Sequence, residues 1–241
     1  MSNATIFTDK SLIPHEMNVH NFYLAWTEGN FGIYFLNSVF YTTAVVFGII
    51  VISSLAAYAF SRLQFWGKNF FFYMFVAAMM IPLPGSFVPL YVLMNNLHLV
   101  NTRTGYILCM INVGLSFSIL LLKTFFDKMP PDLEDAARID GCSKLGIWRH
   151  VALPLARPAL AVIVIFNSLN VWNEYILATL LLNDRSLMPL QRGVMVFQGS
   201  HSVDYPLLMA GLTIAALPII LIYLLMQKHF IKGLSSGAIV G

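Results

Sequence analysis

Glu174 is the one acidic residue inside the long apolar stretches of this sequence, and three asparagines, Asn167, Asn170 and Asn173, precede it closely. On one continuous helix, Asn167, Asn170 and Glu174 would share a face at i, i+3 and i+7. Their carboxylate and amide groups can hydrogen-bond the hydroxyls of a polar solute, so the four residues are candidates for lining its path. The competing interpretation, which we favour, is a structural or gating role at the outer interface or against a companion subunit.

Patterns for bond-breaking chemistry are absent. The sequence has no G-x-x-x-x-G-K-[ST] phosphate loop, G-x-S-x-G nucleophile turn or H-E-x-x-H zinc motif. Its six histidines offer no pair at ligand spacing on one helix, so no metal site is predicted. Cys109 and Cys142 are not expected to form a disulfide. We expect a chain that is no enzyme, holds no cofactor and takes its energy from a partner or an ion gradient.

The composition indicates a membrane protein, because 58% of the residues are hydrophobic and 10% are charged. The apolar runs are nearly continuous, which is typical of helices rather than of alternating barrel strands. Most are long enough to cross about 30 Å of hydrocarbon. The predicted fold is an all-α, polytopic helical bundle with about five spans: 34–60, 69–94, 106–126, 159–182 and 207–226.

The lysines and arginines indicate the orientation. Ten lie on the side of the loop 127–158 and the C-terminus, against four on the other side. Since cytoplasmic loops carry the excess, we predict an external segment 1–31, a transmembrane domain 32–227 with 127–158 as a cytoplasmic loop, and a cytoplasmic tail 228–241. This bias explains the net charge of +3, and no nucleic-acid partner is expected.

An external N-terminus is unusual here because no signal peptide is visible in the first segment. Either five helices follow a short translocated tail, or an initial membrane helix precedes Met1. The second possibility is favoured.

The loop 127–158 is predicted to begin with a helix. Pro130 and Pro131 can start it, and the acidic residues that follow suit its positive end. One face of this helix would carry small and apolar residues that let another protein approach closely; its members are Leu133, Ala136, Ala137 and Asp140. A docked helix is favoured over one that lies on lipid headgroups.

A turn and a second helix should follow. Gly141 can adopt the left-handed conformation that ends a helix. Ser143 can cap a second helix over 144–150, and Pro154 and Pro158 mark the return to the membrane. The result is a helix, a tight turn and a helix, held at both ends by membrane spans.

The spacing in this loop resembles the EAA loop of ABC-transporter permeases, whose pattern is E-A-A-x3-G-x9-I-x-L-P. Asp135-Ala136-Ala137, Gly141 and Val151-Ala152-Leu153-Pro154 match it, with Asp in place of Glu and Val in place of Ile. The shorter Asp135 puts the usual acid contact in question. Further segments are similar to carbohydrate-importer permeases of the maltose type: 54–62, 80–82, 89–91, 172–174 and 233–238.

This resemblance implies a multi-pass subunit of the bacterial inner membrane that forms half of the translocation pathway for a sugar or oligosaccharide. It implies as partners a second permease subunit, two ATP-binding subunits that carry ATP and Mg, and an extracytoplasmic solute-binding protein. Family members usually have six helices. The helix around 135–140 would be the coupling helix, and the residues expected to dock on the ATPase are Leu133, Asp135, Ala136, Ala137, Asp140, Gly141, Leu153 and Pro154.

Other functions are weighed against this one. An ABC permease for an amino acid or polyamine is the nearer alternative, disfavoured by the matches at 172–174 and in the tail. An ion-coupled secondary transporter would need intramembrane charges or inverted repeats, and one acid with no visible repeat argues against it. A purely structural membrane subunit would need no docking helix with matched spacing.

Overall fold

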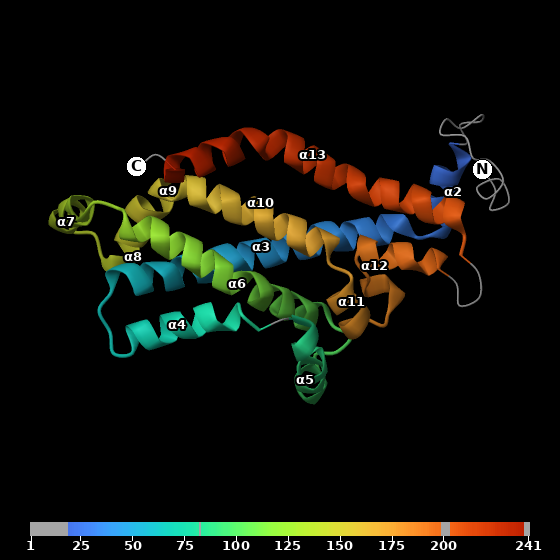
Figure 1. The fold of residues 1–241 in the computed structure, drawn as a ribbon, viewed down its shortest axis with the longest axis horizontal. Helices are drawn as coiled ribbons and strands as arrows, with labels where there is room; N and C mark the ends of the chain where they lie inside the picture. Colours follow the sequence, from blue (N-terminus) through green and yellow to red (C-terminus); the bar gives the residue numbers. More distant parts are fainter. Residues whose placement is uncertain (1–18, 82, 199–202, 239–241) are drawn as a thin grey trace. The chain divides into compact units, whose positions relative to one another are not determined.

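The computed structural model describes residues 19–81, 83–198 and 203–238. In these ranges the regular structure is helical, apart from one isolated bridge between Gln198 and Val203 (Figure 1). The all-α prediction is confirmed. The longest helices are α3 (Phe31–Arg62), α6 (Arg103–Asp127), α10 (Arg157–Asn173) and α13 (Tyr205–Ala238). The shorter ones are α2 (His20–Glu28), α4 (Lys68–Ala78), α5 (Leu83–Asn96), α7 (Pro131–Ile139), α8 (Lys144–Ile147), α9 (Leu153–Leu155), α11 (Ile176–Leu181) and α12 (Leu190–Val194).

Two helices within the described ranges, α3 and α6, are long and apolar enough to cross a membrane, and the number is three if a bent pair is counted as one span. That pair joins Lys144–Leu155 to α10 through an angle of 76°. Helices α3 and α6 coincide with the first and third spans predicted from the sequence, and the fifth lies within α13. In the predicted external segment, α2 is helical, and residues 1–18 lie outside the described residues.

The second and fourth predicted spans are each divided between two helices, and for the fourth this corrects the prediction of one continuous helix. The second is divided between α4 and α5. Helix α4 ends in a tightened turn, because the N–H groups of Met79, Met80 and Ile81 each donate to the carbonyl three residues earlier. Pro84 stands in the first turn of α5, where proline is tolerated because its missing N–H would have no partner within the helix. Pro82 lies outside the described residues.

The chain forms two compact units. The first contains the described residues of 1–42, 91–106 and 169–224. Its core joins the start of α3 to α12 and α13, and the members are Phe31, Tyr34, Trp172, Met188, Leu190, Val194, Leu208 and Ala215. The buried Trp172 donates its indole N–H to the carbonyl of Ala215 at 3.0 Å. Asn37 in α3 donates to the carbonyls of Ser186 and Met188, at 2.8 and 3.0 Å, which holds the loop before α12.

The second unit contains the described residues of 43–90, 107–168 and 225–241. Its part of α3 lies against its part of α6, where the rings of Tyr58 and Phe126 meet edge to face with centroids 6.0 Å apart. Glycine permits close helix contact here: a Cβ atom at Gly48 would come within 2.6 Å of the Ile111 side chain. This unit also carries the whole polar loop 127–158.

Candidate functional site

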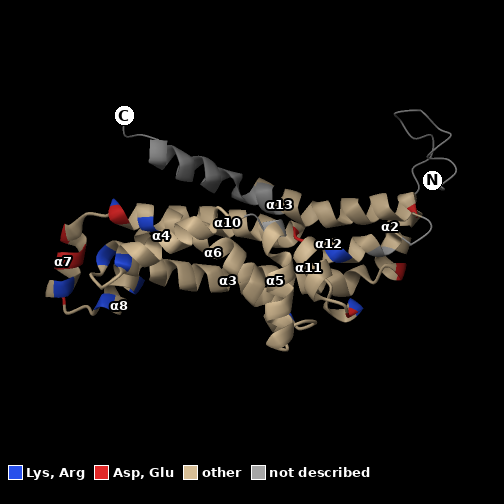
Figure 2. Cartoon of the chain, turned by 60° about the horizontal axis from the view of Figure 1, so that its bottom comes forward, with Lys and Arg blue, Asp and Glu red and all other residues tan. Residues whose placement is uncertain are grey.

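Helix α7 begins where the sequence predicts. Pro131 is its first residue and Pro130 its N-cap, with Asp132 and Glu134 in the first turn. Proline suits this position because its missing N–H would have no partner in the helix, and the acids suit the positive end of the helix dipole. Figure 2 shows acidic and basic residues together on α7 and a basic residue on α8, whereas the body of α6 is free of charged residues over most of its length.

Gly141 ends α7 in the predicted left-handed conformation, with φ of +82°. The N–H of Gly141 donates to the carbonyl of Arg138 at 3.0 Å, and that of Cys142 donates to the carbonyl of Ala137 at 2.9 Å. These two bonds form a Schellman motif, which satisfies carbonyls that a helix end otherwise leaves open. The turn between α7 and α8 is therefore closed by backbone hydrogen bonds.

Ser143 caps the second helix as predicted, because its Oγ accepts from the N–H of Gly146 at 3.2 Å. The predicted end at 150 is wrong, since the helical path runs on to Leu155. A wide π-helical turn, Trp148–Ala152, makes this possible: the N–H of Leu153 donates to the carbonyl of Trp148, five residues back. The wider turn admits Pro154, which has no N–H to donate.

The predicted docking residues of α7 do not share one face. Leu133, Ala136 and Asp140 are exposed. Ala137, in contrast, is only 7% exposed and lies on the buried side of α7. The prediction for Ala137 is wrong because, at i+3 from the buried Glu134, it lies on the inner side of the helix. Ile139, which the sequence analysis missed, is 87% exposed. Its spacing of three from Ala136 could have indicated it.

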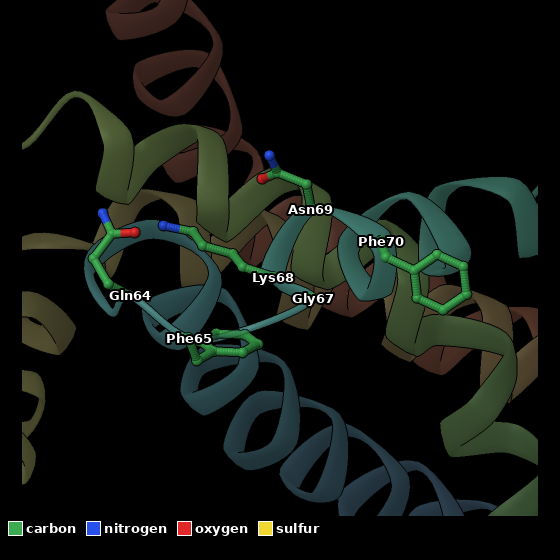
Figure 3. A pocket seen from close by; sticks show the side chains of 6 residues that line it. All are labelled: Gln64, Phe65, Gly67, Lys68, Asn69 and Phe70. Carbon is green, nitrogen blue, oxygen red and sulfur yellow. The ribbon is translucent and has the colours of Figure 1, made fainter.

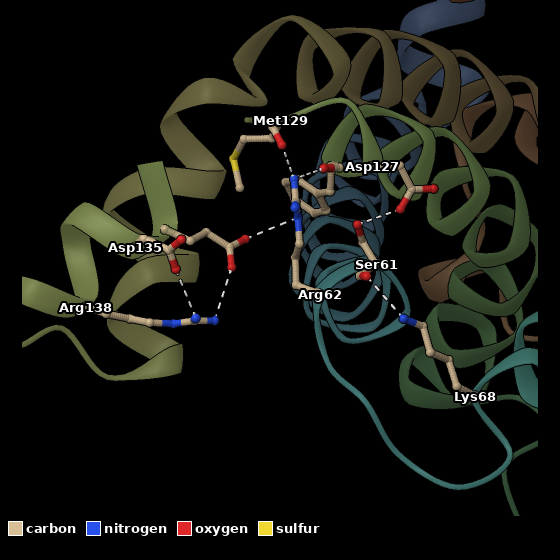
Figure 4. Close-up of polar contacts among 9 residues, drawn as sticks. Ser61, Arg62, Lys68, Asp127, Met129, Asp135 and Arg138 are labelled. Carbon is tan, nitrogen blue, oxygen red and sulfur yellow. Dashed lines mark hydrogen bonds and ion pairs between the residues drawn. The ribbon is translucent and has the colours of Figure 1, made fainter. Parts of the chain in front are cut away.

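Asp135 lies on the exposed side of α7, and its nearest cation is on the same helix. Its Oδ1 accepts from Nη1 of Arg138 at 3.2 Å, and both side chains are more than half exposed. Such a pair contributes little to stability. The buried acid of α7 is its neighbour Glu134, whose Oε1 lies 3.2 Å from Nε of Arg62 (Figure 4). The sequence pattern placed Glu134 only among the acids at the positive end of the helix and gave no sign of this pair.

Leu153 and Pro154, the last two predicted docking residues, lie at the far end of the second helix. Leu153 is partly exposed and Pro154 is exposed. Between them and α7, Ile147 and Ala152 are buried and anchor this helix in the second unit. The structure thus leaves the Leu133 side of α7 and the surface of Pro154 open to a partner.

We expect Gly141→Val to weaken association with an ATPase partner about tenfold, because left-handed backbone costs a β-branched residue roughly 1–2 kcal/mol. A Cβ atom at this position would meet nothing within 4 Å, so the effect would come from the backbone alone. Gly141→Asn is the matched control, since asparagine tolerates this conformation. The amount of ATPase that co-purifies with each variant measures the association. Equal amounts with Gly141→Val and Gly141→Asn would contradict the expectation.

Asn167 is a core residue of the second unit. It is 1% exposed, and its Nδ2 donates to Oγ of Ser118 at 3.2 Å and to the carbonyl of Ile163 at 2.9 Å. Gly114 lies so close that a Cβ atom there would stand 2.1 Å from Oδ1 of Asn167. The side chain thus joins α10 to α6, and it is not on an open face of this chain.

Asn170 and Asn173 are exposed, but Glu174 does not continue their helix. Helix α10 ends at Asn173, so the predicted i, i+3, i+7 face of Asn167, Asn170 and Glu174 is wrong. Glu174 instead caps α11: its Oε1 accepts from the N–H of Leu177 at 2.6 Å, and its Oε2 from that of Ala178 at 3.1 Å. The carboxylate takes N–H groups that a continuous helix would pair with carbonyls, which divides the fourth predicted span.

Helix α11 is held at its other end as well. The N–H of Asn101 donates to the carbonyl of Leu181 at 2.7 Å, and the side chain of Asn101 accepts from the N–H groups of Asn183 and Asp184, both at 2.9 Å. The Asp184 carboxylate accepts from the N–H of Ser186, which lowers its pKa. Glu174 also accepts from the hydroxyl of Tyr106 at 3.3 Å, so its partners are all within the first unit.

We expect Glu174→Leu to destabilise the protein by about 1–3 kcal/mol, because the N–H groups of Leu177 and Ala178 would lose their acceptor. Glu174→Gln keeps one acceptor oxygen and should cost less. Thermal unfolding in detergent measures both. A Glu174→Leu variant of unchanged stability that has lost solute transport would contradict the capping role and favour the path-lining interpretation.

A hollow of about 470 Å³ lies at the turn between α3 and α4 (Figure 3). Its lining comes from one short segment: Gln64, Phe65, Gly67, Lys68, Asn69 and Phe70. None of the predicted site residues belongs to it.

Comparison with known proteins identifies the class to which this helical architecture and its polar loop belong. The family described as binding-protein-dependent transport system inner membrane component matches residues 31–236, and the chain belongs to this family. It is an ABC-transporter permease, a non-catalytic component of the inner membrane.

Individual relatives are similar over nearly the whole chain. The probable ABC transporter permease protein YurM of Bacillus subtilis is 36% identical over 98% of this chain and 78% of its own length. The diacetylchitobiose uptake system permease protein NgcG of Streptomyces coelicolor is 32% identical over 98% of this chain and 79% of its own. A crystal structure of a bacterial ABC transporter for import of the acidic polysaccharide alginate matches with a TM-score of 0.82 and 26% identity, over 95% of this chain and 86% of that one.

Proposed function

We propose that this chain forms half of the membrane pathway through which a sugar or oligosaccharide is imported, driven by ATP hydrolysis in a separate subunit. The observation that carries the proposal is α7 with its Schellman turn and capped second helix: a rigid polar element with an exposed apolar edge, inside a chain of this permease family. Relatives named for diacetylchitobiose, arabinooligosaccharides and melibiose, raffinose and stachyose support a carbohydrate as solute.

The proposed topology has five spans in this chain, with α4 and α5 together as the second, α10 and α11 as the fourth, and α13 as the fifth. Broken helices are tolerated at membrane depth where protein or water satisfies the freed backbone groups. The loop 127–158 and the C-terminal tail are cytoplasmic. Ten of the 14 lysines and arginines on that side support this orientation.

The proposed assembly contains a second permease subunit, two ATP-binding subunits and an extracytoplasmic solute-binding protein. ATP and Mg are bound by the ATP-binding subunits. Helix α7 is the coupling helix, and its exposed edge, Leu133, Ala136, Ile139 and Asp140, enters a cleft of one ATP-binding subunit together with Asp135 and Gly141. Closure of the ATPase dimer then moves α7, and the spans alternate between inward- and outward-facing states.

The solute path is proposed to pass the exposed polar side chains Asn170 and Asn173. Amide groups suit a neutral carbohydrate because they can donate to and accept from hydroxyls. Asn173 accepts from Gln191 at 3.4 Å, which adds a third amide to this surface. Asn167 and Glu174 serve the path by holding α10 and α11.

Transport in reconstituted vesicles tests the proposal. Vesicles that contain both permeases, the ATPase and loaded binding protein should take up labelled oligosaccharide when ATP is enclosed on the ATPase side. Uptake should stop when the ATPase or the binding protein is omitted. Uptake of an amino acid or polyamine in place of sugar would favour the alternative permease function, and uptake driven by an ion gradient without ATPase would refute the ABC function.

A further inference from the structure

The last residue of α3, Arg62, caps the end of a different helix. Its guanidinium Nη2 donates to the carbonyl of Phe126, in the last turn of α6, and to that of Met129, two residues after α6 ends. The final carbonyls of a helix have no intrahelical partner and lie at the negative end of its dipole, so a cation from α3 is favourable there. Arg62 thereby joins the ends of α3 and α6 (Figure 4).

The same guanidinium pairs with the buried acid of α7. Arg62 Nε lies 3.2 Å from Oε1 of Glu134, close enough for an ion pair although not aligned as a hydrogen bond. The side chains are 14% and 7% exposed, so water screens this pair little. The second oxygen of Glu134, Oε2, lies 3.7 Å from Nη2 of Arg138 on the outer side of α7. Glu134 therefore stands between a buried and an exposed cation.

Further contacts stiffen the junction of α3 and α6. Ser61 Oγ donates to Oδ1 of Asp127 at 2.6 Å, and Lys123 Nζ lies 2.7 Å from its Oδ2. Lys68 Nζ donates to the carbonyl of Ser61 at 3.1 Å. The ends of α3 and α6 are thus held together by several side chains. Among the described residues, the ion pair from Arg62 to α7 is made by Glu134 alone.

We propose that Arg62 and Glu134 are positioning residues that make α7 move as one body with α3 and α6. The proposal rests on the role of α7 as coupling helix. A force on α7 reaches α3 through the ion pair and α6 through the carbonyls that Arg62 caps. Loss of the pair would leave α7 attached by the backbone at its two ends, by its packing against α8 and the π-helical turn, and by the contacts around Ala137. ATP hydrolysis would then continue with less movement of the spans.

The first test compares solute transport with ATP hydrolysis in the assembled transporter. For Glu134→Gln, which keeps the shape of the side chain and removes its charge, the solute imported per ATP hydrolysed should fall about tenfold, while ATPase co-purification is retained. Arg62→Lys keeps the positive charge and loses the planar guanidinium, so it should lower the solute imported per ATP hydrolysed by less. Lys123→Gln is the matched control: it removes a cation from the same helix ends without touching Glu134 and should change the ratio little.

A second measurement follows the attachment of α7 in the full chain. Spin labels at Gln64→Cys, just after α3, and Asp132→Cys, in the first turn of α7, report their separation once Cys109 and Cys142 are replaced by alanine and serine. With Glu134 in place, the labelled pair should give one narrow distance distribution. Glu134→Gln should broaden it. This distance can be measured without the ATP-binding subunits. It therefore also tests the ion pair in a variant that fails to assemble with them.

The outcomes separate the two proposals. An unchanged ratio of transport to ATP hydrolysis in Glu134→Gln, or an unchanged distance distribution, would overturn the positioning role. A parallel fall of transport and hydrolysis at an unchanged ratio would do so too. Absence of any ATPase bound to the unaltered chain would instead overturn the coupling role of α7, whatever the label distances show.

Discussion

Ile139→Asp is expected to weaken binding of the ATP-binding subunit at least about a hundredfold. Ile139 is 87% exposed on α7, next to the turn at Gly141, and an isoleucine so exposed adds nothing to the fold of this chain. Apolar side chains that fill a pocket of a partner commonly contribute about 2–4 kcal/mol to binding. A carboxylate in that pocket would also be desolvated without a partner. The test is the affinity of the free ATP-binding subunit for a permease complex immobilised on a surface.

Ile139→Leu is the control at the same position, because it keeps the apolar volume and should bind normally. The thermal stability of the isolated permease should be the same for both variants, since the side chain has few contacts within the chain. An Ile139→Asp complex with unaltered ATPase affinity would show that the partner approaches another part of the loop.

Gly114→Leu is expected to prevent stable folding of the second unit. At Gly114 even a Cβ atom would lie 2.1 Å from Oδ1 of Asn167 and 2.5 Å from Cδ1 of Ile49, so α3, α6 and α10 could not keep their present contact. Overpacking of a tight core costs about 1–3 kcal/mol for small additions and more for large ones. The yield of monodisperse protein in detergent and its unfolding temperature measure the effect.

Gly114→Ala provides a graded version with an internal control. Its cost should shrink in the background Asn167→Ala, which removes the amide that the new methyl group would strike. The two substitutions should therefore be non-additive by about 1 kcal/mol or more. Strict additivity would contradict the close approach of α6 and α10 at this point. Gly85→Ala, where a Cβ atom meets nothing within 4 Å, should leave stability nearly unchanged or raise it.

The α7 loop was the part of the fold that the sequence predicted best, because its signals are local. Prolines at the start, Gly141 at the end and Ser143 as the next cap each act within a few residues. The inner and outer sides of α7 were not predictable in the same way. They depend on Arg62, which reaches Glu134 from the end of α3, and on the neighbouring elements that bury Ala137.

The division of the fourth predicted span escaped prediction for a related reason. Hydrophobicity alone makes 159–182 one helix, and only the position of the Glu174 carboxylate relative to the N–H groups of Leu177 and Ala178 shows that a second helix starts there. The polar group of Asn167, Asn170, Asn173 and Glu174 was likewise predicted from closeness in sequence. The structure separates the buried Asn167 from the exposed Asn170 and Asn173, because Asn167 fits against Gly114.

Site-directed photo-cross-linking from α7 tests most directly whether an ATPase drives this permease through that helix. A photoreactive residue at position 139 in the assembled transporter should form a cross-link to the ATP-binding subunit, and one at the equally accessible Val88, which is 76% exposed on α5, should not. A cross-link from position 139 to lipid alone, with the ATP-binding subunit unlabelled in both nucleotide states, would contradict the account.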